Sequence, residues 1–330
     1  MNYGFSASRL VAGCLVSLVF LPLMTWCGTS SRRMESVNIS PDGRVIALVA
    51  SKGRTSFIYT VAVDTGVATR LTDAKDGEET SPTFSPDGKR IAYSYEPGNH
   101  TRSRIVIVNV DGTDMHQGSP SSVTDLSPVL SPDNATIVFA RADIYGSYSP
   151  IAQPHPHGWS FFASNLDGTN VRQLTAERFY MASRPSISPD GKNMVVVTEG
   201  LETHQQIAIY SIISPGPPLH TFQPHIPNEV SHKQPIFAYP NYLPDGSILF
   251  MAADSHVSYD VYRLKPDTGA IEKLTNRNGY ATELKVSAGG KTAAFLKWHK
   301  NWKLEVTDPE PYLLDLESHK LKPLRVSGLN

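Results

Sequence analysis

The stretch FSPDGKRIAYSYE (84–96) predicts two strands joined by a tight turn. Pro86 fixes φ near the value required at the second position of a type I turn, and Gly88 can adopt the left-handed conformation that closes a three-residue hairpin. The Ser85 hydroxyl can bond back to the turn backbone. Beyond the turn, RIAYSYE alternates at the period of two that is typical of a strand.

This turn recurs along the chain in six related copies. They are VNISPDG (37–43), PTFSPDG (82–88), PVLSPDN (128–134), PSISPDG (185–191), PNYLPDG (240–246) and LKVSAGG (284–290). Asn134 replaces glycine in the third copy, and asparagine tolerates the left-handed conformation well. Successive copies are 45, 46, 57, 55 and 44 residues apart. These spacings are counted between the turn prolines at 41, 86, 132, 189 and 244, and to Ala288 in the last copy.

A second turn follows each pair of strands, so each unit contains four short strands. These turns are VDTG (63–66), VDGT (110–113), LDGT (166–169), SPGPP (214–218), PDTG (266–269) and LESHK (316–320). Four antiparallel strands repeated every 40–50 residues or so are typical of a propeller blade. We therefore expect an all-β, six-bladed propeller of four-stranded antiparallel blades over residues 34–330. The first strand should start near Val37 and the last should end near Val326, leaving nothing to complete a shared blade.

The N-terminal segment, residues 1–33, is expected to be a signal peptide or an N-terminal membrane anchor. LVAGCLVSLVFLPLMTW (10–26) is an uninterrupted apolar run after Arg9, and it has no place in a blade. Both cysteines, Cys14 and Cys27, lie in this segment, so the propeller has no disulfide. Either cysteine has a partial lipoprotein signal around it, which leaves a lipid anchor open. We expect the protein to be exported to the periplasm or cell envelope, with the membrane contacted only through this segment.

The repeated SPDG followed by [KR]-x-[IVL]-[AV] resembles the TolB-like six-bladed propeller family, a WD40-like repeat of the PD40 type. The resemblance covers residues 35–328. It implies the propeller fold, but such repeats also occur in periplasmic interaction proteins, in propellers of prolyl-oligopeptidase-like peptidases and in oligogalacturonide lyases. TolB itself carries an α/β domain before its propeller, and this chain has no room for one, which argues against a role in the Tol system.

No catalytic signature is present in the sequence. It contains no GxSxG nucleophile elbow, which argues against a peptidase, and no HExxH, glycine-rich phosphate loop or EF-hand. We therefore assign no catalytic residue, cofactor or metal ligand. The repeat aspartates (Asp42, Asp87, Asp133, Asp190 and Asp245) are expected to serve turn geometry. With 30 basic and 31 acidic residues the net charge is −1, so nucleic acid is not expected as a partner.

Blade topology places every tight turn on one face and every long connection on the other. The two largest insertions, 140–159 and 223–239, should both lie on this long-loop face. Most histidines and several aromatic residues fall in the same connections. The candidate ligand-binding residues are His155, His157, Trp159, His225, His232, His256, Trp298, His299 and Trp302. Either loops simply hold more polar residues, or these side chains form a binding rim.

The expected function is an exported, non-enzymatic binding or scaffold propeller. Its partner would be an envelope protein, a peptide or a glycan on the long-loop face, and we expect a monomer. The alternative is a polysaccharide-acting enzyme that resembles oligogalacturonide lyase and holds a divalent metal through histidines. Metal content and release of an unsaturated uronate product would separate the two.

Overall fold

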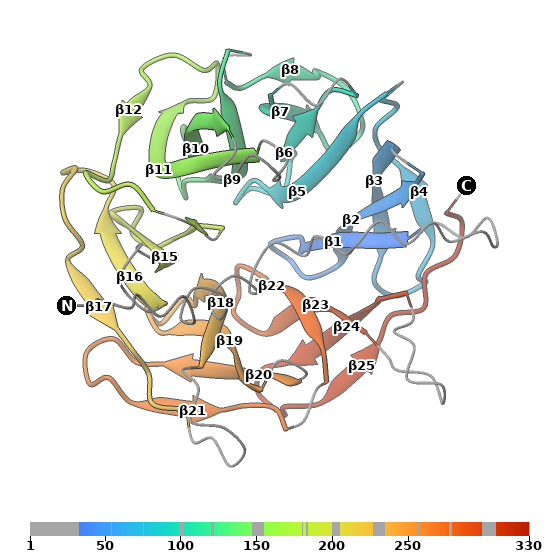
Figure 1. Ribbon diagram of the computed structural model, residues 1–330. Coiled ribbons are helices and arrows are strands. Elements are labelled where there is room, and N and C mark those ends of the chain that lie inside the picture. Colours follow the sequence, from blue (N-terminus) through green and yellow to red (C-terminus); the bar gives the residue numbers. More distant parts are fainter. Residues whose placement is uncertain are drawn as a thin grey trace, which may run out of the picture. The chain divides into compact units, whose positions relative to one another are not determined.

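The protein is a six-bladed propeller in which each blade is a four-stranded antiparallel sheet (Figure 1). The computed structural model describes residues 33–329 except 54, 75, 99–101, 120–121, 147–154, 180, 183, 200–204, 227–234, 256–257, 277–278 and 299–307. The expected export segment thus lies outside the described residues, apart from Arg33. Strands and turns make up the described chain, which confirms the all-β prediction.

The first three blades follow one another in chain order, each from its inner to its outer strand. Blade one comprises β1 (Arg33–Ile39), β2 (Val45–Lys52), β3 (Thr55–Ala62) and β4 (Ala68–Arg70). Blade two comprises β5 (Glu78–Phe84), β6 (Arg90–Glu96), β7 (Arg104–Asn109) and β8 (His116–Gln117). Blade three comprises β9 (Thr124–Leu130), β10 (Thr136–Gly146), β11 (His155–Asn165) and β12 (Arg172–Gln173).

The remaining blades repeat the pattern, with an interrupted inner strand in blade four. There β13 (Met181–Ala182) and β14 (Ser186–Ile187) both pair with β15 (Asn193–Glu199), followed by β16 (Gln206–Ser211) and β17 (His220–Phe222). Blade five comprises β18 (Ile236–Tyr242), β19 (Ile248–Ser255), β20 (Ser258–Leu264) and β21 (Ile271–Lys273). Blade six comprises β22 (Ala281–Val286), β23 (Thr292–Lys297), β24 (Glu310–Asp315) and β25 (Leu321–Pro323).

The repeated turns adopt the predicted geometry. Gly88 has φ 72°, and Asn134, which replaces this glycine, has φ 57°. In blade two the Ser85 hydroxyl accepts the Arg90 N–H at 2.9 Å and donates to the Asp87 carboxylate at 2.5 Å. Asp87 in turn accepts the Lys89 N–H at 3.0 Å. The serine and aspartate of each SPDG copy therefore satisfy the turn backbone, which explains why the phrase recurs.

The inner strands form a continuous ring around the propeller axis. Each of β1, β5, β9, β14, β18 and β22 contacts the inner strands of both neighbouring blades (Figure 1). In four blades a residue at a bulge of this strand takes a left-handed conformation. These residues are Ser81, Ser127, Tyr239 and Glu283. A bulge re-aims a side chain. The equivalent positions in the repeat are Ser36 in blade one and Arg184 in blade four.

A threonine or serine just after the outer strand supports the third strand of four blades. Thr72, Ser119, Thr175 and Thr275 each accept the backbone N–H of the residue 14 positions earlier, at 2.9 to 3.1 Å. This hydroxyl supplies an acceptor for a buried strand N–H, and in blade one the Glu79 carboxylate shares it. This second repeat, whose motif is Leu-Thr in three of the four blades, was not predicted from the sequence.

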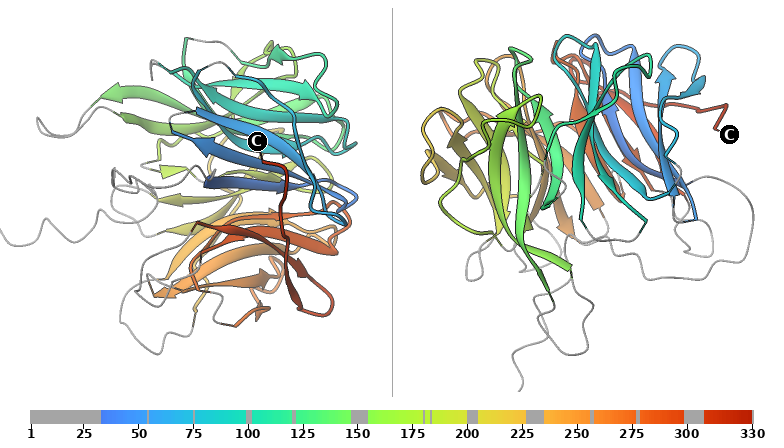
Figure 2. Two further views of the ribbon diagram at one scale, coloured as in Figure 1. Left: turned by 90° about the vertical axis from the view of Figure 1, so that its right-hand side faces the viewer. Right: turned by 90° about the horizontal axis from the view of Figure 1, so that it is seen from above.

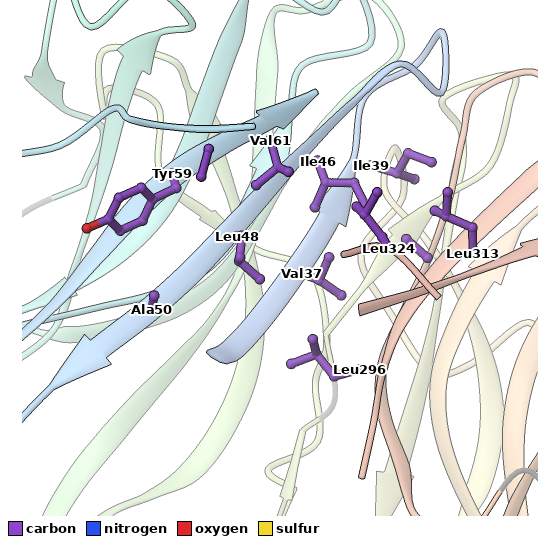
Figure 3. Close-up of a cluster of buried hydrophobic side chains, with 12 residues drawn as sticks. Val37, Ile39, Ile46, Leu48, Ala50, Tyr59, Val61, Leu296, Leu313 and Leu324 are labelled. Carbon is purple, nitrogen blue, oxygen red and sulfur yellow. The ribbon is translucent and has the colours of Figure 1, made fainter. Parts of the chain in front are cut away.

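The ring closes between blades six and one through an apolar core and a C-terminal segment. Figure 3 shows the core, in which Val37 and Ile39 of β1 pack with Leu296 and Leu313 of blade six. Beyond β25, Ser327 forms a parallel bridge with Val67. The Ser327 N–H donates to the Gly66 carbonyl at 2.9 Å, and the Ser327 carbonyl accepts the Ala68 N–H at 2.8 Å.

Two details of the predicted closure were therefore wrong. The outer strand of blade six ends at Pro323 and not near Val326, so a short segment remains and bonds to blade one. The first strand begins at Arg33 and not near Val37. No blade is shared between the two ends of the chain, as predicted, because each sheet consists of strands that are consecutive in sequence.

A substitution at Gly66 should reveal how much this C-terminal segment contributes. Gly66 has φ 71°, and a Cβ there would lie 1.9 Å from the Arg325 carbonyl oxygen. Gly269 is the matching glycine of blade five, with φ 69° and nothing within 4 Å of an added Cβ. Both alanine variants carry left-handed strain, but only Gly66→Ala must displace the segment. We expect Gly66→Ala to lose about 1–2 kcal/mol more stability in urea unfolding than Gly269→Ala. Equal losses would mean that the segment does not contribute to closure.

Candidate binding site

The long-loop face is the end of the blades at which first strands begin, second strands end and third strands begin. Antiparallel order within each sheet places these points together. In the right-hand view of Figure 2 the β10–β11 hairpin extends beyond the lower edge of the blades on this side. The flanks of both long insertions emerge there, since one follows β10 and the other follows β17. Their central residues, 147–154 and 227–234, lie outside the described part.

An aromatic cluster with one cation lies on this face where blades five, six and one meet. The rings of Tyr259 and Tyr280 are 5.7 Å apart, edge to face, and those of Tyr280 and Trp298 are 5.9 Å apart. The Arg33 guanidinium carbon lies 5.0 Å from the centre of the Trp298 ring. All four side chains are half-buried. We call this group the rim cluster.

Two backbone hydrogen bonds, one within blade six and one between blades five and six, fix the rim cluster in place. The Trp298 N–H donates to the Tyr280 carbonyl at 2.8 Å, and the Tyr259 N–H donates to the Gly279 carbonyl at 2.8 Å. Burial raises the pKa of Tyr259 to about 12 and also raises the pKa of Tyr280, so both phenols remain hydrogen-bond donors. The indole Nε1 of Trp298 is buried without a hydrogen-bond partner among the described residues. Stacked aromatic faces with unused polar groups are typical of binding surfaces.

The structure brings together only part of the predicted site. Trp298 belongs to the rim cluster, whereas Trp159 is half-buried against the core of blades three and four. The Trp159 backbone is bonded in both directions to Phe179, at 2.7 and 3.1 Å. His157 is half-buried on β11, and His225 is exposed after β17. Four predicted residues lie outside the described part, as does the side chain of a fifth: His232, His256, His299, Trp302 and His155.

A polar group on the propeller axis was not predicted. Arg184 of blade four forms an ion pair with Glu283 of blade six, and its Nη1 also donates to the Ser36 hydroxyl at 3.2 Å. Ser36 donates to the same Glu283 oxygen at 2.6 Å. Of the two charged side chains, 17% of Arg184 and 8% of Glu283 are exposed. This group, which we call the axial cluster, links blades four, six and one across the centre.

Two further side chains of the inner strands complete the axial cluster. Lys285 lies two residues after Glu283 on β22, and its side chain is half-buried. Desolvation, with a smaller effect of the Arg184 charge, lowers the pKa of Lys285 to about 8. Tyr239 occupies the equivalent bulge position of blade five, and burial together with the Glu283 charge raises the pKa of its phenol. The axial cluster is thus a desolvated site with two cationic groups, one carboxylate and one neutral phenol.

Within the described residues, no group of three or more histidine, cysteine, aspartate or glutamate side chains is placed to hold a metal ion. The described part also contains no helix with the length and apolarity needed to cross a membrane. Among the six candidate histidines, only His157 and His225 have side chains within the described part.

Comparison with known proteins agrees with this architecture. Residues 30–152 match the family described as TolB beta propeller domain. The chain is 30% identical over 181 residues to the Tol-Pal system protein TolB of Francisella tularensis subsp. holarctica, an alignment that covers 53% of this chain and 38% of that protein. The chain is therefore a TolB-like six-bladed propeller, and its match spans less than half the length of this relative.

Solved structures share the fold at low sequence identity. Putative TolB from Agrobacterium tumefaciens superposes with a TM-score of 0.60 at 16% identity, over 90% of each chain. Oligogalacturonate lyase in complex with manganese superposes with a TM-score of 0.56 at 13% identity, over 87% of this chain and 75% of the lyase. At such identities the likeness shows the propeller fold alone.

Proposed function

We propose that this protein is an exported, non-enzymatic binding or scaffold propeller that recognises an envelope protein, a peptide or a glycan on its long-loop face. The rim cluster is the observation that carries the proposal. Backbone hydrogen bonds fix the residues that carry its three aromatic rings, so these side chains lose little conformational entropy on binding. The relative named as a Tol-Pal system protein supports a partner in the cell envelope. Nothing in the described residues favours the lyase alternative.

Substitution of Trp298 tests this proposal. The partner is first isolated from the envelope of the native host with the wild-type protein as bait, and its dissociation constant is then measured. Trp298→Ala is expected to weaken binding by about 2 kcal/mol, the effect typical of an aromatic anchor. Trp298 is preferred to Trp159, because Trp159 also packs against the core.

The matched control is Asp111→Ala in an exposed tight turn on the opposite face, where Asp111 accepts hydrogen bonds from the N–H and the hydroxyl of Thr113. This variant should bind like the wild type. The proposal is wrong if Trp298→Ala, verified as folded by its unfolding midpoint, binds normally while Asp111→Ala loses affinity.

A further inference from the structure

The axial cluster has an excess of positive charge. Arg184 and Lys285 are cationic, and Glu283 is the one carboxylate between them, which leaves a net charge of +1. Glu283 is already engaged by the Arg184 ion pair and by the Ser36 hydroxyl. Lys285 forms no ion pair or hydrogen bond with another described residue. Buried or half-buried ammonium groups normally have an anionic or hydrogen-bonding partner.

Unused donors point to where an anion would lie. The hydrogen bonds that Arg184 makes with described residues involve Nη1, so Nε and Nη2 have no partner among these residues. Lys285 lies close enough to Arg184 and Glu283 for both charges to affect its pKa. Tyr239 is influenced by the same two charges, and its phenol stays protonated as a further donor. The three residues belong to neighbouring inner strands of the ring: Arg184 to blade four, Tyr239 to blade five and Lys285 to blade six.

We propose that the axis of the propeller binds a carboxylate between Lys285 and Arg184. A singly charged anion neutralises the excess charge of the cluster, whereas a phosphate dianion would overcompensate it. The guanidinium fork and an ammonium also match the two oxygens of a carboxylate. The carboxylate belongs either to a free small acid or to the chain end or acidic side chain of a larger partner. This inference is independent of the rim cluster and goes beyond the proposed function.

The pKa of Lys285 in the wild-type protein provides a direct readout. Lysines are labelled with 13C at Cε, the Lys285 signal is assigned from its absence in Lys285→Arg, and its titration is followed by NMR. Acetate should raise the pKa of Lys285 by about one unit or more, because a bound anion stabilises the charged ammonium. Chloride at the same ionic strength should not. Binding should accordingly weaken as the pH rises past the Lys285 pKa, because the ammonium then loses its charge while the Tyr239 phenol stays protonated.

Two peptides identify the source of the carboxylate. Acetyl-trialanine with a free C-terminal carboxylate and its C-terminal amide differ in this group alone. A larger pKa rise with the acid peptide than with acetate, and none with the amide, indicates the carboxylate of a larger partner. A response to acetate without a response to the acid peptide indicates a small acid.

Variants provide the control. Acetate should raise the thermal unfolding midpoint of the wild type and of Lys192→Met, which removes an exposed lysine beside the tight turn of blade four, on the face opposite the long-loop face, but not that of Lys285→Met. The proposal is overturned if no carboxylate shifts the Lys285 pKa, if chloride shifts it equally, or if Lys285→Met keeps the full response to acetate.

Discussion

Arg184→Met is expected to lower the free energy of unfolding by about 3–5 kcal/mol, the largest effect of any substitution considered for this protein. Methionine keeps much of the side-chain volume but removes the guanidinium. The Glu283 carboxylate would then remain buried with the Ser36 hydroxyl as its donor among the described residues. Lys285, the other nearby cation, forms no ion pair with Glu283, so the buried carboxylate loses its direct partner, and such a loss costs far more than the ion pair contributes. Urea unfolding at neutral pH measures the loss.

The double variant Arg184→Met, Glu283→Gln separates this cause from a simple loss of packing. The neutral amide removes the buried carboxylate that has lost its ion-pair partner, so most of the lost stability should return. Arg44→Met, in an exposed position beside a tight turn, is the matched control and should be close to neutral. If the double variant is no more stable than Arg184→Met, then the cost does not arise from the unpaired Glu283 carboxylate.

Glu79→Gln is expected to change how stability depends on pH. Glu79 is buried at the start of β5, where it accepts the Ile58 N–H at 3.1 Å and the Thr72 hydroxyl. Desolvation raises the pKa of this carboxyl from 4.5 to about 7. A folded-state pKa above the unfolded value means that unfolding releases a proton between these pH values. The stability that protonated Glu79 contributes is therefore complete below about pH 4.5 and is lost as the pH rises through 7.

The comparison is made as a difference between variant and wild type across pH. The free energy of unfolding of Glu79→Gln minus that of the wild type should rise by about 2–3 kcal/mol between pH 4.5 and pH 8. Only the wild type loses stability in this range, as Glu79 ionises. Glu272→Gln, at an exposed position on β21, should follow the wild-type curve. Parallel curves for Glu79→Gln and the wild type would show that Glu79 is ionised in the folded protein throughout this range.

Most of the fold could be predicted because each blade repeats the same local chemistry. The Pro-Asp-Gly turn is specified within four residues, and Asn134 confirms it because a left-handed position accepts few other residues. The closure contact could not be found in this way. It depends on Ser327 meeting Gly66 across the whole length of the chain, and nothing local in either segment encodes that pairing.

The candidate site was predicted less well, because the search favoured loops and histidines. Trp298 was identified, but its partners Arg33 and Tyr280 were not, since they meet only where separate blades join. The axial cluster did have a signal in the sequence. At the bulge position, blades one to three carry Ser36, Ser81 and Ser127, whereas blades four to six carry Arg184, Tyr239 and Glu283. Aligning the repeats by column would have shown three large polar residues on one side of the ring.

Photo-crosslinking from the two faces tests most directly whether the long-loop face is the binding face. A benzophenone amino acid replaces Tyr280 in the rim cluster or, in a second variant, Thr268 in an exposed tight turn on the opposite face. Both variants are expressed in the native host and irradiated in intact cells. We expect a discrete crosslinked partner from position 280 and none from position 268. A discrete partner from position 268 alone would contradict the assignment of the binding face.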